Sequence, residues 1–282
     1  MFDTPFVESV VHPSDFSEAS HTAFIHALAI AVNRQGRLNV IHVLTRDEPS
    51  DASDHSPRVR GTLELWGLLE PDTPRSKVNE VLSLDIGKIE VLAPDPLGAI
   101  VAALDKRPAD LVVLATEGRD GLPRWLRPSV AEGVARRSKT MTLFVPNESR
   151  GFVSPDNGHM NLKRILVPVD HAPNPDAAIT YAARLAASSS EDLVEIFPLH
   201  VGPQTDSPRL DLPEFETLRW NTIHREGQIV DRIVDTAEEL SADLIVMATA
   251  GAKGILGAIR GSVTERVLRR SHRPLLAVPE RG

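Results

Sequence analysis

The chain repeats one pattern twice, and this repeat limits the fold more than any other feature of the sequence. Residues 110–121 match residues 243–254 at an offset of 133, and each segment is an apolar run that leads into a loop with glycines. The same offset relates Ser129 to Ser262. Two copies of one structural unit predict two domains, and a chain of 282 residues can give each domain a core of its own.

Short apolar runs alternate with amphipathic segments in both copies. The runs that predict strands in the first copy are residues 6–12, 38–44, 88–92, 110–115 and 140–145. Those in the second copy are residues 164–169, 194–201, 220–224, 244–248 and 275–278. Because helical segments such as residues 176–187 and 228–240 lie between the runs, the strands are expected to be parallel. The sequence predicts an α/β fold of two doubly wound domains, each a five-stranded, mostly parallel sheet with helices on both faces.

Two stretches lack a clear period. Residues 45–80 contain four prolines and many acids, and they predict a solvated insertion in the first copy with one helix near residues 61–69. Residues 147–161 are rich in Asn, Ser, Gly, Pro and Asp, have little to bury, and predict a linker. The expected domains are therefore residues 1–146 and residues 162–282.

The loop of the second copy has the features of an anion site. Four glycines, at positions 251, 254, 257 and 261, lie between a predicted strand and a predicted helix. Glycines allow backbone N–H groups to approach oxygen atoms, and a helix N-terminus offers unpaired donors with a partial positive charge. Ser262 and Glu265 also form a capping box, and a capping hydroxyl there can donate to a phosphate oxygen as well. We expect this loop to bind phosphate.

Positive charge gathers around the same loop. Residues 250–273 contain six cations and a single acid, Glu265, so their net charge is +5, whereas the whole chain carries −8. The six are Lys253, Arg260, Arg266, Arg269, Arg270 and Arg273. Cationic side chains form strong hydrogen bonds with phosphate oxygens, so this charge also favours phosphate.

The composition argues against several classes of protein. Cysteine is absent, which rules out disulfides and cysteine nucleophiles and suits a reducing compartment. The longest apolar stretch, residues 23–32, is shorter than the ~20 residues that span a bilayer, and the first residues lack the basic start of a signal peptide. An acidic balance with one Tyr and three Trp does not suit a nucleic-acid binder. We expect a cytoplasmic protein with neither a membrane nor a nucleic-acid partner.

Catalytic motifs are missing from the chain. It has no His-Glu-x-x-His pair, no Gly-x-Ser-x-Gly elbow and no Gly-x-x-x-x-Gly-Lys loop. His42 and His200 recur at equivalent strand ends, which could suit a metal, but lone histidines on apolar strands are more often hydrogen-bonded core residues. We therefore expect no catalytic residue, no metal ligand, and a weak ATPase at most.

An aspartate follows the first strand of each copy. If the fourth strand lies beside the first, Asp170 and the Gly251 loop meet at the switch point of the sheet, where doubly wound folds bind ligands. Asp170 would then accept from the amine of adenine or from a ribose hydroxyl, unless it is only a turn residue or a cap before the helix at residue 176. Asp15 begins a capping box that ends at Glu18, which explains it without a ligand.

These motifs resemble those of the universal stress protein family. Residues 12–20, His-Pro-Ser-Asp-Phe-Ser-Glu-Ala-Ser, resemble the opening of many members, and Gly251-x-x-Gly254 followed by Gly261-Ser262 resembles their ATP-binding loop. The resemblance covers nearly the whole chain apart from the insertion and the linker. It implies the adenine nucleotide alpha hydrolase-like fold and an adenine nucleotide, ATP or AMP, with Mg²⁺ reaching the site only through the phosphates. The residues implied for the base are Pro168, Asp170 and Val201, and those implied for the phosphates are Ala250, Gly251, Lys253, Gly254, Gly261, Ser262 and Val263.

The two loops depart from the family pattern to different degrees. Six residues separate Gly254 from Gly261, whereas nucleotide-binding members have nine, so the shorter arc leaves less room for a triphosphate. In the first copy Pro128 takes the place of Gly261 and supplies no N–H. We expect the second domain to hold the ligand and the first domain, with its degenerate loop, to bind weakly or not at all.

Three functions are compatible with this sequence. The first is an adenine nucleotide-binding module in stress response or signalling, whose occupancy shifts a contact with an unidentified protein partner. The second is a slow Mg-dependent ATP hydrolase, and the third is a ligand-free scaffold that binds partners.

The last strand of each copy, residues 140–145 and 275–278, would be an apolar edge if its domain stood alone. In the family such strands commonly pair across a dimer. The resemblance therefore implies that the two domains pack as an internal pseudo-dimer, and the free helical faces leave room for a homodimer of whole chains.

Overall fold

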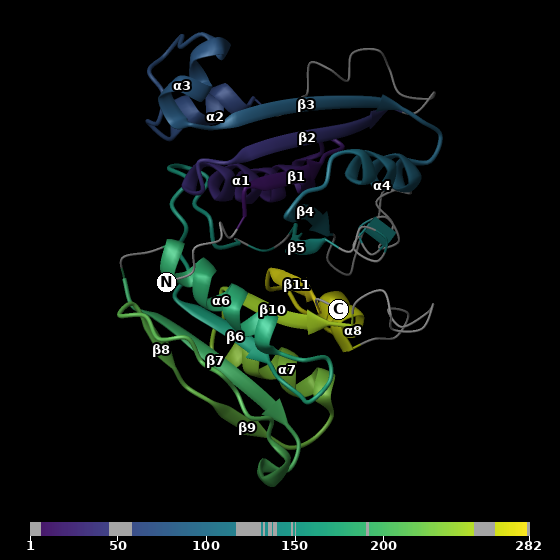
Figure 1. Ribbon diagram of the computed structural model, residues 1–282, viewed down its shortest axis with the longest axis vertical. Coiled ribbons are helices and arrows are strands. Elements are labelled where there is room, and N and C mark those ends of the chain that lie inside the picture. The colour runs from purple at the N-terminus through teal and green to yellow at the C-terminus, as the bar shows by residue number, and fades with distance from the viewer. Residues whose placement is uncertain are drawn as a thin grey trace.

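A computed structural model describes residues 7–44, 58–116, 131, 133–134, 137, 140–147, 149, 151–189, 192–250 and 263–280. The strands in these residues form one 11-stranded sheet with the order β3-β2-β1-β4-β5-β11-β10-β6-β7-β8, and β9 also pairs with β7. Figure 1 shows this sheet running the length of the molecule, with the first half at one end and the second half at the other.

In the described residues, the first half contains the strands β1 to β5 and the helices α1 to α4. Its strands are β1 (Ser9–Pro13), β2 (Arg37–Leu44), β3 (Asp85–Leu92), β4 (Leu111–Thr116) and β5 (Met141–Pro146). Its helices are α1 (Glu18–Asn33), α2 (Val59–Leu65), α3 (Val78–Leu82) and α4 (Pro96–Lys106), with a 3₁₀ turn η2 (Arg75–Lys77).

The second half repeats this plan. Its strands are β6 (Arg164–Pro168), β7 (Val194–Val201), β8 (Leu218–Trp220), β9 (Ile223–Arg225), β10 (Leu244–Thr249) and β11 (Leu275–Pro279). Its helices are α6 (Asp176–Ser189), α7 (Ile229–Glu239) and α8 (Val263–Arg270), with a 3₁₀ turn η3 (Gln204–Asp206). The single strand predicted at residues 220–224 is wrong in detail: two short strands flank Asn221, whose amide donates to Glu195 at 3.2 Å.

Helices cover both faces of the sheet, as the sequence predicts. Helices α1 and α6 contribute to one apolar core, and α4, α7 and α8 contribute to the other. Strands covered on both faces need apolar side chains at consecutive positions, which explains the unbroken apolar runs. All strand pairs in the described residues are parallel except β11 with β5, so the predicted mostly parallel α/β fold is confirmed.

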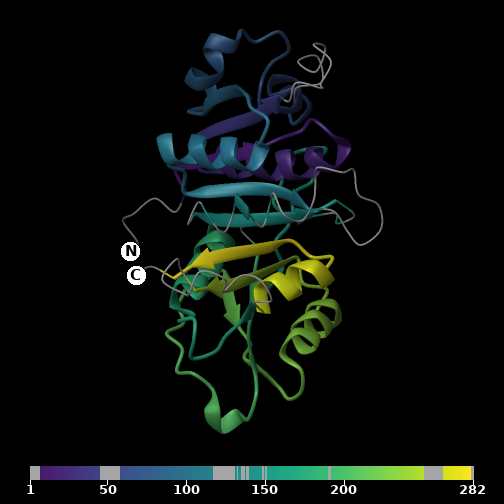
Figure 2. The same cartoon turned by 90° about the vertical axis from the view of Figure 1, so that its right-hand side faces the viewer.

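The two halves are joined at the centre of the sheet by β5 and β11. These strands run antiparallel, with Leu275 opposite Phe144, Leu276 opposite Leu143, and Ala277 opposite Thr142. Figure 2 shows the yellow β11 at the middle of the molecule, between the two halves. Each half therefore covers the apolar edge of the other, and the predicted pairing of the last strands is present.

Cleaving the chain after Asp156 is expected to leave the two halves associated, because the β5 and β11 ladder and both cores remain intact. A protease site inserted there and cut in the purified protein tests this on a sizing column. One peak at the elution volume of the uncut chain is expected. Two separate, soluble half-size species would show that the halves are held together by the linker alone.

The aspartate that begins each repeated segment has a structural role. Asp110 Oδ2 accepts hydrogen bonds from the backbone N–H groups of residues 8 and 9, both at 2.9 Å. Asp243 Oδ2 accepts from those of residues 163 and 164 at 2.8 and 2.9 Å. Each carboxylate thus fixes the start of the first strand of its own half beside the fourth.

The prediction of a solvated insertion is wrong for its described part, residues 58–80. Val59, Leu63 and Trp66 are buried in the core on the α1 side. Val59 and Leu63 lie on one face of the short helix α2, and Trp66 follows as its C-cap residue. Figure 1 shows α2 and α3 beside β3.

The expectation that the linker has little to bury is also wrong. Phe152, Val153 and Met160 are buried, and residues 153 and 160 form an antiparallel bridge. The Trp66 indole donates to the carbonyl of Pro155 at 2.8 Å. The segment is therefore packed against the first half through apolar contacts and a specific hydrogen bond.

Candidate functional site

A cavity of about 240 Å³ opens at the carboxyl ends of the second half's strands. There β6 pairs with β7 on one side and with β10 on the other. The chain after β6 therefore builds the sheet first on the β7 side and later, at β10, on the opposite side. This arrangement is the switch point of a doubly wound sheet, where such folds bind ligands. The prediction that the first and fourth strands are neighbours is confirmed, since β6 pairs with β10.

The cavity wall is mostly apolar. Leu199 comes from β7, Ile229 and Ile233 from α7, and Met247 from β10. Ile229 is also one of the large apolar side chains that remain exposed, at 40%. An apolar cavity with an exposed apolar residue in its wall suits a flat, weakly polar group such as a nucleobase.

Half of the predicted site residues line this cavity. They are Pro168, Asp170, Val201, Ala250 and Val263, which come from four different parts of the chain. The other five, Gly251, Lys253, Gly254, Gly261 and Ser262, lie outside the described residues, as does Pro128 in the first half. The topology therefore brings together every predicted residue that the structure describes.

Asp170 is exposed at the cavity, and its Oδ1 accepts a hydrogen bond from the His171 N–H at 2.7 Å. It does not cap the next helix, since the side chain of Asn174 accepts from the N–H of Asp176 at 2.8 Å. The helix-capping alternative for Asp170 is therefore wrong.

The predicted capping box that begins at Asp15 is wrong. The N-cap of α1 is Ser17, whose hydroxyl accepts from the Ser20 N–H at 3.2 Å. Asp15 instead accepts from the N–H and the hydroxyl of Ser17, at 3.0 and 2.6 Å. Phe16 has a φ of 61°, and this left-handed residue delays the start of the helix.

Glu265 lies in the cavity wall, a role that the sequence reasoning missed. Its side chain is only 3% exposed and forms an ion pair with Arg269, 2.5 Å from Oε1 to Nη2. A buried carboxylate is unfavourable unless it is paired, and an arginine four residues later on a helix is placed to pair with it. The spacing of Glu265 and Arg269 was the available signal.

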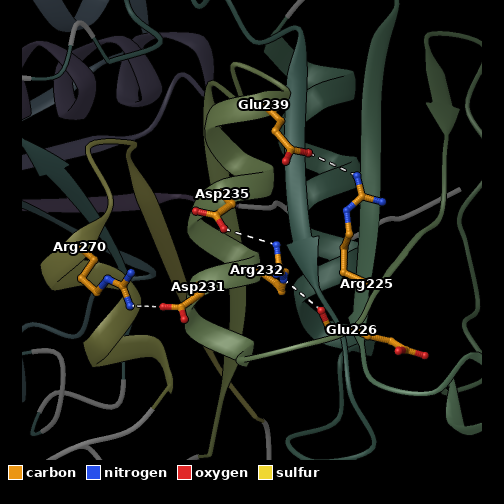
Figure 3. A network of polar contacts seen from close by, with 7 residues as sticks. All are labelled: Arg225, Glu226, Asp231, Arg232, Asp235, Glu239 and Arg270. Carbon is orange, nitrogen blue, oxygen red and sulfur yellow. Dashed lines mark hydrogen bonds and ion pairs between the residues drawn. The ribbon is translucent and has the colours of Figure 1, made fainter.

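Three of the six cations near the loop are paired with acidic side chains, which reduces the positive charge available to a phosphate. Besides Arg269, Arg270 pairs with Asp231 at 2.5 Å and Arg273 pairs with Glu238 at 2.7 Å. Figure 3 shows the pair of Arg270 and Asp231, which joins α8 to α7. The net charge of +5 for residues 250–273 does not include these partners, because Asp231 and Glu238 lie on α7.

The charged face of α7 also holds β9. Arg225 pairs with Glu239 at 3.3 Å, and Arg232 donates to the carbonyl of Glu226 at 3.0 Å and contacts Asp235 at 3.7 Å (Figure 3). These pairs are solvent-exposed, so each contributes little to stability. The Arg225 and Glu239 pair links β9 to α7, an element that lines the cavity.

The two equivalent histidines are buried in the core. His42 Nδ1 donates to the Ser14 carbonyl at 2.8 Å, and His200 Nδ1 lies 3.4 Å from the Val169 carbonyl. In the described part of the chain no group of three or more His, Cys, Asp or Glu side chains could hold a metal ion. Nor does that part include a helix both long and apolar enough to cross a membrane.

Comparison with known proteins links this architecture to one family. The model of the universal stress protein family matches residues 7–146 and 210–279. A universal stress protein of Mycobacterium tuberculosis is 24% identical over 302 residues, which covers 95% of each chain. One from Methanocaldococcus jannaschii is 31% identical over 144 residues, 43% of this chain and 85% of the relative.

Solved structures show the same fold over the whole chain. The crystal structure of a universal stress protein from Archaeoglobus fulgidus aligns with a TM-score of 0.64 at 20% identity, and the alignment covers 98% of this chain and 99% of that one. At this identity the likeness concerns the fold alone.

Proposed function

The chain belongs to the universal stress protein family, and on this premise we propose that it is a nucleotide-binding module whose second half holds an adenine nucleotide. One observation carries the proposal. Residues 168, 170, 201, 250 and 263 come from four separate parts of the sequence, and the resemblance to the family implies that each contacts the nucleotide. All five line one cavity at the switch point.

The cavity suits the nucleoside part of the ligand. Its apolar walls accept a base, and the carboxylates of Asp170 and Glu265 can accept hydrogen bonds from an exocyclic amine or from ribose hydroxyls. The same carboxylates would repel phosphates. The cavity volume of about 240 Å³ is smaller than the roughly 300–1,000 Å³ of pockets that hold drug-sized ligands. A cavity of this size suits the nucleoside part of the ligand rather than a whole nucleotide.

The phosphates are assigned to the loop at residues 251–262 on the sequence pattern. The loop lies between Ala250 and Val263, which both line the cavity, so phosphates attached to a nucleoside there would lie close to the loop ends. ATP and AMP share this nucleoside, and Mg²⁺ would be held through the phosphates. Occupancy of the cavity would change the surroundings of Val263 at the start of α8, and a partner protein in stress response or signalling could detect that change.

The first test is to identify the ligand directly. Purified protein is denatured, and any released nucleotide is identified by mass spectrometry and then titrated into stripped protein by calorimetry. Intact ATP or AMP supports the module. A product that accumulates with turnover would instead support the hydrolase, and the absence of any nucleotide from both measurements would support the scaffold.

Asp170→Ala is expected to weaken nucleotide binding roughly 10- to 100-fold, because it removes a charged hydrogen-bond acceptor worth about 1.5–3 kcal/mol. The matched control is Asp15→Ala, since Asp15 occupies the equivalent position in the first half. Calorimetry on both variants should show the loss only for Asp170. The opposite result would assign the ligand to the first half.

A further inference from the structure

The second half's cavity has one wall from the first half. Strand β5 runs antiparallel to β11, so the amino end of β5 lies beside the carboxyl end of β11. That end of β11 faces the cavity, since Ala277 and Pro279 line it. Thr140, Thr142 and Phe144 line it as well, although they precede the second half in the chain. We call these three residues the β5 wall.

Strand alternation explains why these three residues share the cavity. Residues two apart on a strand point to the same face, so Thr142 and Phe144 face the side of α7 and α8. Phe144 and Ala277 belong to the apolar core on that side. Leu143, which lies between Thr142 and Phe144 in the strand, belongs to the core on the α1 and α6 side. The β5 wall is therefore fixed by the register of the antiparallel pair.

The wall is rigid as well as close. Thr142 is completely buried, and its hydroxyl donates to the Thr140 carbonyl at 3.0 Å. A β-branched side chain has few rotamers, and this hydrogen bond selects one of them. Phe144 is only 3% exposed. A ligand in the cavity would meet a preformed surface.

We propose that the β5 wall is part of the nucleotide site, so that the second half's site is complete only when the first half is paired with it. This inference rests on the proposed function of the cavity. Thr142 sets the depth of the cavity on this side and acts as a specificity-determining residue for the nucleoside. The proposal also gives the first half a role in ligand binding that does not require a phosphate-binding loop in the first half.

The full-length variant Thr142→Leu tests the proposal. Leucine adds bulk toward the cavity, and the repeat offset of 133 places Leu275 at the equivalent position, so leucine is compatible with this strand environment. Nucleotide affinity is expected to fall at least about tenfold while the midpoint of thermal unfolding without ligand is retained. The control Leu143→Met changes the neighbouring residue, which belongs to the core on the α1 and α6 side, and should stay within about threefold of the wild type.

The outcomes separate the wall from the function of the cavity. If wild-type protein binds nucleotide and Thr142→Leu binds it equally well, the β5 wall is not part of the site and the proposed function still stands. If wild-type protein binds no adenine nucleotide, both proposals fail. Should the leucine variant not fold, nuclear Overhauser contacts between ligand protons and the Thr142 methyl group in wild-type protein decide the question. Contacts are expected, and their absence from a saturated complex would overturn the proposal.

Discussion

Val201→Trp is expected to reduce nucleotide affinity by roughly 100-fold or more, since an indole at this position would occupy the space of the base. Val201 lies at the end of β7, lines the cavity and is only partly buried. The larger side chain can therefore project into the cavity without entering the core. Calorimetry with the nucleotide that copurifies measures the loss, and thermal unfolding without ligand checks that the variant folds.

The matched control is Val43→Trp. The repeat places Val43 at the equivalent position of the first half, because His42 corresponds to His200. If the second half holds the ligand, this variant should keep the affinity of the wild type. Loss of binding in Val43→Trp, with binding retained in Val201→Trp, would move the ligand to the first half.

Acidification is expected to destabilise the protein strongly between pH 6.5 and pH 4. Burial lowers the pKa of His12 from 6.5 to about 4, against the opposing effect of its hydrogen bond to the Val113 carbonyl. Burial lowers the pKa of His26 to about 4 in the same way, opposed by its bond to the Thr22 carbonyl. Both side chains are neutral in the folded protein well below the pH at which they protonate in the unfolded chain.

The direction of the effect follows from proton linkage. Between pH 6.5 and pH 4 the unfolded chain binds more protons, so stability is fully present above pH 6.5 and is lost as the pH falls toward 4. Each histidine contributes about 1.4 kcal/mol per pH unit, or about 3 kcal/mol over the window. His26 also has a specific reason to stay neutral, because its Nε2 accepts from the Phe152 N–H at 3.0 Å. A protonated Nε2 cannot accept that bond.

Urea unfolding at pH 7 and pH 5 measures this loss. His26→Gln is expected to be less stable than wild type at pH 7 but to lose less stability on acidification, because one titrating group has been removed. His159→Gln is the control, since His159 is exposed and no change of the pH dependence is expected. Identical pH dependence in wild type and His26→Gln would show that His26 does not cause the acid sensitivity.

The fold was predictable because its main signals are local and repeated. Apolar runs such as residues 244–248 mark strands covered on both faces, and the offset of 133 identifies the second copy. The position of the cavity followed from topology, since the first and fourth strands of a doubly wound sheet are neighbours. The sequence could therefore place Asp170 near the end of the fourth strand, whereas Val201 was implied only by the resemblance to the family.

The remaining features depend on partners distant in sequence. Trp66 is buried under a segment that contains Pro155, its hydrogen-bond acceptor, and nothing near Trp66 indicates that contact. The acidic partners of Arg270 and Arg273 lie on a neighbouring helix, so the charge of residues 250–273 gives no sign of these pairs. Thr142 carries no motif at all, and only the antiparallel pairing of two halves brings it to the cavity.

A crystal structure of the full chain with AMP tests the central claim most directly. The account predicts density for the base between Val201 and Met247, with the ribose near Asp170 and the phosphate toward Val263. A base bound at the equivalent strand ends of the first half, or a ligand that contacts none of these residues, would contradict it.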